Sequence, residues 1–318
     1  MTDPIKVDVH MHLYPSASSG AWWKGGYEIW EYGAKDDVAF SRYHGTVDDA
    51  LDAMAKAGFR HGVAVNMLSV DLFREEAVAA LPEDLPVEQR ARAVAEIERT
   101  MADRFRASNR WLVELLGPIP RLTAYVGVDP WALTPEQNVE HLREMAERGA
   151  RGIKLHPVAQ RFEPGDPRME RVYRACEAFD LVVLSHTGSA KGAEPFAEPR
   201  AFAPVLERHP LLKVVLAHLG GGSWRQTLDL ARAFPQVAFD LCEIIEWTGA
   251  PGAPGDQELA RMIREIGPER VMLGTDFPWY DLDRTVELVM GLPLLATGEK
   301  EEILGANAVR ILDLPVDA

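Results

Sequence analysis

Short apolar runs rich in β-branched residues recur along the chain, and longer segments with helical hydrophobic spacing separate them. Each run ends in polar, glycine or proline residues, which is typical of repeated strand–helix units. The predicted strands are residues 5–10, 62–67, 122–128, 152–156, 181–186, 213–218, 236–241 and 270–276. Eight such units predict an α/β fold, a closed (β/α)8 TIM barrel.

Apolar residues at helical spacing lie between these strands, at residues 47–57, 136–148, 167–179, 224–234, 257–266 and 282–290. A last helix, residues 300–312, is expected to close the barrel. Two connections are too long to be simple loops. Residues 14–45 form an insertion after the first strand, and residues 68–120 form a helical insertion after the second. No linker divides the chain, so we expect one domain over residues 1–318.

The first insertion is rich in aromatic residues, with Trp22, Trp23, Tyr27 and Trp30 within nine positions. Such rings could wall a pocket for a planar substrate above the end of the first strand. They could equally pack the insertion onto the barrel or form a subunit interface, where aromatic residues are also enriched. We favour these packing or interface roles over the pocket wall.

Composition narrows the possible partners. The chain carries 34 basic and 49 acidic residues, a formal net charge of −15, which repels nucleic acid and anionic lipid. No apolar run reaches the length of a membrane span, so we expect a cytoplasmic protein that acts on a small molecule and that could form a homodimer. Cys176 and Cys242 are far apart in the sequence, so a metal here would depend on histidine and carboxylate.

The strongest chemical signal is the sequence Val-Asp-Val-His-Met-His at residues 7–12. Strand alternation predicts that Asp8, His10 and His12 share one face, opposite Val7, Val9 and Met11. Later strands end in further ionisable residues: Lys154, His156, His186, His218 and Asp276. The carboxyl ends of barrel strands face a common bowl, so these side chains are expected to converge.

Neutral imidazole and carboxylate are the ligands that zinc-like ions prefer. Spacing alone does not separate the ligands among these residues from His218. The paired histidines on the first strand, the single histidines on the fifth and sixth, and the aspartate on the eighth resemble the amidohydrolase superfamily.

The motifs Gly-Ile-Lys-Leu-His-Pro, His-Thr-Gly, Ala-His-Leu-Gly-Gly-Gly and Gly-Thr-Asp-Phe-Pro narrow the resemblance. They resemble the amidohydrolase-related branch that contains aminocarboxymuconate-semialdehyde decarboxylase and γ-resorcylate decarboxylase. The resemblance implies one divalent ion, zinc or alternatively manganese, held by His10, His12, His186 and Asp276. It also implies that His218 is the catalytic histidine.

Lys154 allows two interpretations. Superfamily members with two metals carry a carboxylated lysine near this position, so a second ion at Lys154 stays open. Alternatively, Lys154 forms an ion pair inside the barrel, for example with Asp8. We favour one metal. We expect His156, Lys154, Asp240 and Trp279 to contact the substrate, although His156 could instead cap the turn before Pro157.

The favoured function is a metal-dependent hydrolase that opens an ester, lactone or amide. The ion would activate water, Asp276 would accept its proton, and His218 would stabilise the developing oxyanion. The alternative is a non-oxidative decarboxylase of an aromatic or unsaturated acid, in which Asp276 or His218 protonates carbon. A second alternative is an inert barrel that only binds a ligand.

Overall fold

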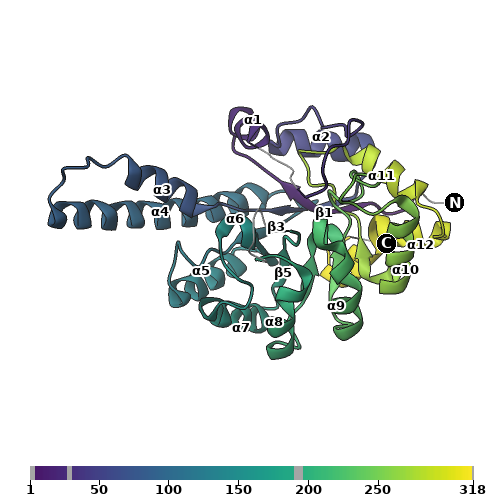
Figure 1. Cartoon of the computed structure of the whole chain (residues 1–318). Coiled ribbons are helices and arrows are strands. Elements are labelled where there is room, and N and C mark those ends of the chain that lie inside the picture. Colours follow the sequence, from purple (N-terminus) through teal and green to yellow (C-terminus); the bar gives the residue numbers. More distant parts are fainter. Residues whose placement is uncertain (1–3, 27–30, 190–195, 317–318) are drawn as a thin grey trace.

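The computed structural model describes residues 4–26, 31–189 and 196–316, and it confirms the parallel β/α barrel (Figure 1). Eight strands lie side by side in chain order: β1 Val7–His12, β2 His61–Val65, β3 Leu122–Gly127, β4 Gly152–Leu155, β5 Val182–Ser185, β6 Val214–Leu216, β7 Ala238–Asp240 and β8 Val271–Met272. The Val9 amide donates to Leu273 O at 3.0 Å and the His12 amide donates to Phe277 O, so β8 returns to β1.

The last three strands are shorter than predicted. The prediction extended them to residues 218, 241 and 276, whereas β6, β7 and β8 end at Leu216, Asp240 and Met272. His218 and Asp276 have φ angles of 63° and 56°, and a β-strand cannot continue through such residues. After these strands the chain therefore turns, and His218 and Asp276 lie in the turns rather than in the strands.

Alternating side chains along the strands separate into two apolar layers. Val182 and Leu184 of β5 pack inside the barrel with residues of β1, β2, β6 and the C-terminal helix, whereas Val183 packs in the layer between strands and helices. Helix α13, Asn307–Leu312, contributes Ala308 and Leu312 to the inner cluster. One end of the barrel is thus filled with apolar side chains.

The remaining helices form the outer layer and the insertions (Figure 1). They are α1 Ala17–Gly25, α2 Val47–Ala57, α3 Val70–Ala79, α4 Val87–Leu116, α5 Pro135–Glu147, α6 Pro157–Gln160, α7 Glu170–Phe179, α8 Ala203–Arg208, α9 Thr227–Ala233, α10 Asp256–Ile266, α11 Leu282–Gly291 and α12 Thr297–Glu301. Of the helices in the described residues, none has the length and apolarity needed to cross a membrane.

Local capping explains where helices begin. At the start of α2 the Thr46 side chain accepts from the Asp49 amide, and the Asp49 side chain accepts from the Thr46 amide. Thr134 and Gln137 repeat this arrangement at α5. Such reciprocal pairs satisfy amides that have no partner within the helix, so these sequence positions fix the helix start.

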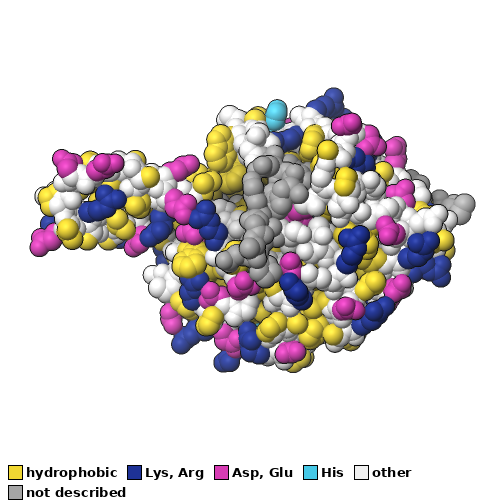
Figure 2. Space-filling view, in the orientation of Figure 1, with side chains coloured by type: hydrophobic (Ala, Val, Ile, Leu, Met, Phe, Trp, Pro, Cys, Tyr) yellow, Lys and Arg dark blue, Asp and Glu magenta, His cyan; other side chains and the backbone are white. Residues whose placement is uncertain are grey.

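The second insertion is an arm of two helices that projects from the barrel (Figure 1). The sequence predicted a helical insertion here, and the structure has α4, of 30 residues, preceded by the shorter α3. Arg74 of α3 pairs with Glu98 of α4 at 3.2 Å. Acidic and basic side chains are interspersed over the arm and the barrel surface (Figure 2).

Candidate metal centre

Strand β1 brings His10 and His12 to the open end of the barrel through a register shift. The pairing with β2 changes between Asp8 and Met11. Val7 and Val9 pack in the inner cluster, and Met11 packs in the outer layer. The predicted simple alternation is therefore wrong, because the irregularity adds one residue to the strand.

Three predicted ligands lie close together. His12 Nε2 lies 3.2 Å from Asp276 Oδ1, and His10 Nε2 lies 3.6 Å from the same oxygen. One donor atom from each of the three residues fits within a mutual distance of 4.8 Å. Burial is the main cause that lowers the pKa of His12 to about 4, against the opposing effect of Asp276, so its imidazole is neutral at pH 7.

His186 follows β5 and faces the same cavity as these three residues. Its Nε2 atom is buried and has no hydrogen-bond partner within the described part of the chain. An unsatisfied buried imidazole nitrogen is costly unless a bound group takes its lone pair or its proton.

Asp240, the last residue of β7, contacts both the His10 ring and the backbone of His218. Its Oδ2 accepts from His10 Nδ1 at 3.1 Å, and its Oδ1 accepts from the His218 amide at 2.9 Å. Burial alone would raise the pKa of Asp240, but the hydrogen bond and the charges of His10 and His218 lower it to about 2. With Nδ1 donating to Asp240, His10 presents the lone pair of Nε2 toward Asp276.

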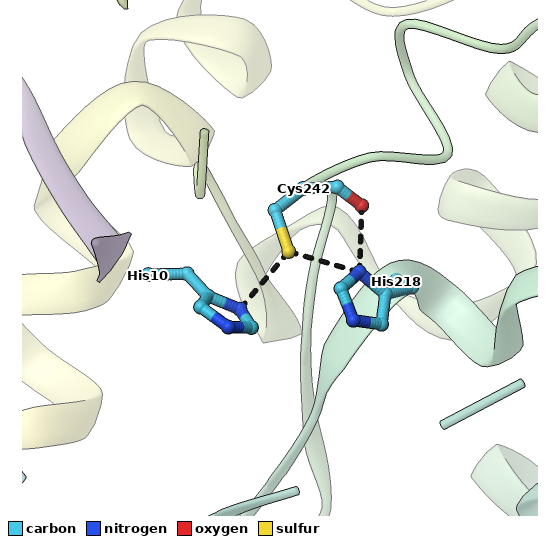
Figure 3. A group of neighbouring side chains, drawn as sticks. All are labelled: His10, His218 and Cys242. Carbon is cyan, nitrogen blue, oxygen red and sulfur yellow. Dashed lines mark hydrogen bonds between the residues drawn. The ribbon is translucent and has the colours of Figure 1, made fainter. Parts of the chain in front are cut away.

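Cys242 joins His10 and His218 behind the cavity (Figure 3). Its Sγ lies 3.0 Å from Nδ1 of each histidine, and its carbonyl oxygen lies 3.1 Å from His218 Nδ1. The three residues form a second cluster of potential ligands. However, His10 Nδ1 already has Asp240 as a partner, and His218 Nδ1 has the carbonyl, so we interpret Cys242 as part of the support for both rings.

Lys154 lies against His10 rather than Asp8. Its Nζ donates to His10 Nε2 at 2.7 Å, and burial lowers the pKa of the ammonium. Asp8 instead accepts from the Thr275 amide at 3.1 Å and from the Thr275 hydroxyl. The expected Asp8–Lys154 ion pair is thus replaced by a contact between the lysine and a predicted ligand.

His156 and Trp279 lie beside the predicted ligands. The His156 ring stacks on the His186 ring with centroids 4.0 Å apart, and its Nδ1 accepts from the Ala159 amide at 3.2 Å. His156 therefore caps α6, which was the alternative role considered for it. The Trp279 ring meets the His12 ring edge-on at 5.3 Å.

Glu31 enters the site from the first insertion. Its Oε1 lies 3.6 Å from His186 Nε2, and its Oε2 accepts from the Gly222 amide at 2.6 Å. A Cβ atom on Gly188 or Gly221 would lie within 2.4 Å of the Glu31 carboxylate, so these glycines make room for it. Burial is the main cause that raises the pKa of Glu31, to about 7.

These side chains line one cavity of about 300 Å³. Its described lining is His10, His12, Tyr14, Trp23, Gly26, Glu31, Met67, Lys154, His156, Val158, Ala159, His186, His218, Glu243, Asp276 and Trp279. Lys154 is the one lysine or arginine in that lining. Asp240 is buried behind His10 and is not part of it. Tyr27 and Trp30 of the aromatic insertion lie outside the described residues.

Comparison with protein families shows which family the chain belongs to. The amidohydrolase family model matches residues 7–314. The chain belongs to the amidohydrolase family. No curated protein matches it closely enough to identify a relative.

Three examples illustrate the solved structures that share the fold of this amidohydrolase. One is 5-carboxyvanillate decarboxylase from Sphingomonas paucimobilis, at 16% identity and a TM-score of 0.63, covering 98% of this chain and 100% of that one. The second is a dihydroxybenzoic acid decarboxylase from a Polaromonas species with bound manganese and 2-nitroresorcinol, at 15% identity, a TM-score of 0.66 and coverage of 100% and 98%. The third is a probable 2-pyrone-4,6-dicarboxylic acid hydrolase from Acinetobacter baumannii. Its identity is 14% and its TM-score is 0.59, and the match covers 97% of this chain and 99% of that one.

Amidohydrolases of this family bind a divalent metal, and the residues of this amidohydrolase fit such an ion. Its donors are imidazole nitrogens and one carboxylate at ligand-to-ligand distances, and His186 Nε2 is a buried atom in need of a partner. His10, His12, His186 and Asp276 are the residues that would hold the ion.

Strained backbone marks the same region of this amidohydrolase. Non-glycine residues with positive φ include His218 and Leu219 after β6, Glu243 after β7 and Asp276 after β8. Such conformations persist only where the surrounding structure holds them, and they cluster at functional sites. The three turns aim His218, Glu243 and Asp276 into one cavity.

Among the residues that sequence reasoning missed, Cys242 and Glu31 lie beside predicted ligands. Cys242 lies two positions after Asp240, so the two-residue period beyond the seventh strand was a signal for it. Glu31 had no comparable signal, because its position depends on how the first insertion folds back over the barrel.

Proposed function

We propose that this amidohydrolase is a metal-dependent decarboxylase of a small planar carboxylic acid. The observation that carries the proposal is the position of Lys154, whose ammonium donates to His10 Nε2 on the floor of the cavity. An ion held by His10 would use this lone pair, and the Lys154 ammonium would then be available to an anion. A carboxylate is the substrate group that such a floor attracts.

A divalent ion in this cage would withdraw electrons from the substrate's carboxylate and an adjacent oxygen. The Tyr14, Trp23 and Trp279 rings line the cavity and suit a flat substrate. His218 Nδ1 donates to Cys242 O, so its Nε2 carries the lone pair. His218 Nε2 would therefore carry the proton.

For a 2-hydroxybenzoate the reaction balances without an outside acid. His218 Nε2 takes the proton of the ring hydroxyl and returns it to the ring carbon that bore the carboxylate. The bond between this carbon and the carboxylate breaks, its electron pair becomes the new C–H bond, and carbon dioxide leaves. The product is the phenolate.

The sequence favoured hydrolysis, whereas the comparisons support its alternative. The solved structures of similar fold include decarboxylases of 5-carboxyvanillate and of dihydroxybenzoic acid, the second with bound manganese. Manganese and zinc, the two ions that the resemblance implies, are therefore both tested. These relatives are too distant to transfer a substrate.

Hydrolysis stays the second candidate because of the carboxylates in the cavity. Glu31 lies 3.6 Å from His186, and Glu243 lies 3.7 Å from His218. This acidic side favours a neutral lactone or ester over a substrate with a second carboxylate nearby. The pyrone-dicarboxylic acid hydrolase of similar fold is consistent with this chemistry.

The test uses protein loaded with Mn²⁺ or Zn²⁺ and a series of 2-hydroxybenzoates. We expect carbon dioxide release and, in D₂O, one deuterium at the ring carbon that carried the carboxylate. Lys154→Met should retain the metal and lose the release. If no acid is decarboxylated while a 2-pyrone or aryl ester is hydrolysed, decarboxylation is wrong and hydrolysis replaces it.

A further inference from the structure

A second cavity of about 310 Å³ adjoins the metal cavity, between the first insertion and the base of the arm. Its lining is His12, Leu13, Tyr14, Pro15, Ser19, Trp23, Val65, Asn66, Met67, Leu68, Arg104, Ser108 and Trp111. Four of these residues, His12, Tyr14, Trp23 and Met67, also line the metal cavity. The two spaces therefore meet at a predicted metal ligand.

Helix α4 presents one face to this second cavity. Arg104, Ser108 and Trp111 lie at positions i, i+4 and i+7, which fall on one side of a helix. Tyr14 and Trp23 stack on each other with centroids 6.3 Å apart. The cavity thus has aromatic walls and one cationic group.

Arg104 differs from its neighbours on the helix. Arg106 pairs with Asp103 at 3.4 Å, and Arg110 pairs with Glu144 at 2.8 Å. The Arg104 guanidinium lies 3.9 Å from the centre of the Phe73 ring, and no acid or hydrogen-bond acceptor among the described residues pairs with it. Its planar donors are held flat by the ring and stay available to an anion.

We propose that this second cavity is a substrate subsite, in which Arg104 binds a distal carboxylate of the molecule whose other end lies at the metal. The inference rests on the proposed function for the metal end. The substrate class is then a two-ended anion with an apolar or aromatic middle. Charge complementarity supports this assignment, because the metal cavity is acidic near Glu31 and Glu243 and the distal carboxylate lies away from them.

Packing is the competing role for Arg104, since its guanidinium lies over the Phe73 ring of α3. Arg104→Met keeps an unbranched apolar stem over the ring and removes the charge. Arg104→Lys keeps the charge and loses the planar pair of donors. Arg99→Met is the matched control, because Arg99 lies exposed on α4, pairs with Glu96 and does not line the cavity.

The experiment measures binding of benzoate, terephthalate and biphenyl-4,4′-dicarboxylate to Mn²⁺-loaded protein by calorimetry. We expect at least one of the two-ended acids to bind about tenfold or more tightly than benzoate, the range of one charged hydrogen bond. Arg104→Met should remove this gain and leave benzoate binding unchanged. Arg104→Lys should retain part of the gain, and Arg99→Met should retain all of it.

Two results would overturn the subsite: two-ended acids that bind no better than benzoate to the wild type, or a gain that survives in Arg104→Met. Thermal unfolding of each variant identifies a folding defect, and Arg104→Lys decides the matter if Arg104→Met does not fold. Failure of the proposed function gives a different result, because the binding pattern then persists while no hydroxybenzoate releases carbon dioxide.

Discussion

The two ends of the barrel both bury histidine, but they satisfy it differently. The closed end is the one that apolar side chains fill. There His61 begins β2 and is 2% exposed, and its Nε2 forms a hydrogen bond with Thr123 Oγ1 at 2.8 Å. At the open end His186 is 7% exposed, and its Nε2 has no hydrogen-bond partner within the described residues, with the Glu31 carboxylate 3.6 Å away. Burial alone therefore does not mark function. The difference lies in whether the neighbouring strands complete the hydrogen bonds.

The surroundings of the two ends follow the same division. The closed end is filled by apolar side chains of the strands and of α13. The open end instead collects Lys154, Asp240, Glu31 and Asp276 around the histidines, at a cost in desolvation that packing does not require. The comparison predicts that substitutions at the open end change metal binding and catalysis, and that those at the closed end change stability.

The largest expected effect is at the open end, in His12→Ala. This change removes a donor 3.2 Å from Asp276, so the variant should lose most of its bound metal and all measurable activity. Metal content by mass spectrometry after equilibrium dialysis checks it, with His61→Gln as the buried-histidine control. Full metal occupancy in His12→Ala would remove the distinction between the two ends.

His218→Asn tests whether His218 is the proton carrier or a metal ligand. The asparagine amide can still donate to Cys242 O, so the metal should stay bound. Turnover should fall by about 10²–10⁴-fold, because the proton carrier is lost. Activity and metal content are measured on the same sample. Loss of the metal together with activity would show that His218 is a ligand.

A smaller effect is expected for Asp240→Asn, which acts through His10. The amide can no longer serve as a charged acceptor for both His10 Nδ1 and the His218 backbone. Metal affinity should fall by about 10–100-fold, the usual cost of losing a partner behind a metal-bound histidine. Competition with a fluorescent chelator measures it. An unchanged affinity would mean that the His10 ring is oriented by packing alone.

Much of this arrangement was predictable because it is local in sequence. Apolar runs predicted the strands, and His10, His12, His186, His218 and Asp276 lie near strand ends that a barrel brings together. Those residues needed only the strand order to be placed in one bowl.

The rest depends on contacts between distant segments. The register shift in β1 separates Val7 and Val9 from Met11, and nothing in the alternation of residues 7–12 indicates it. Cys242 meets His10 across 232 positions. Glu31 and Arg104 reach their cavities through the two insertions, whose folds are set by tertiary packing rather than by strand period.

The smallest effect concerns the closed end, in His61→Gln. Burial is the main cause that lowers the pKa of His61 from 6.5 to about 4, so between these values the unfolded chain binds more protons than the folded one. Wild-type stability should therefore fall as the pH drops from 6.5 to about 4, by roughly 2 kcal/mol more than in the variant. Urea unfolding at pH 7 and pH 4.5 measures the difference, and the open-end histidines cancel because both proteins carry them.

Glutamine can keep the bond to Thr123, so metal content and activity at pH 7 should match the wild type. Equal pH dependence in the two proteins would mean that solvent already reaches His61 and that the apolar side chains do not seal the closed end.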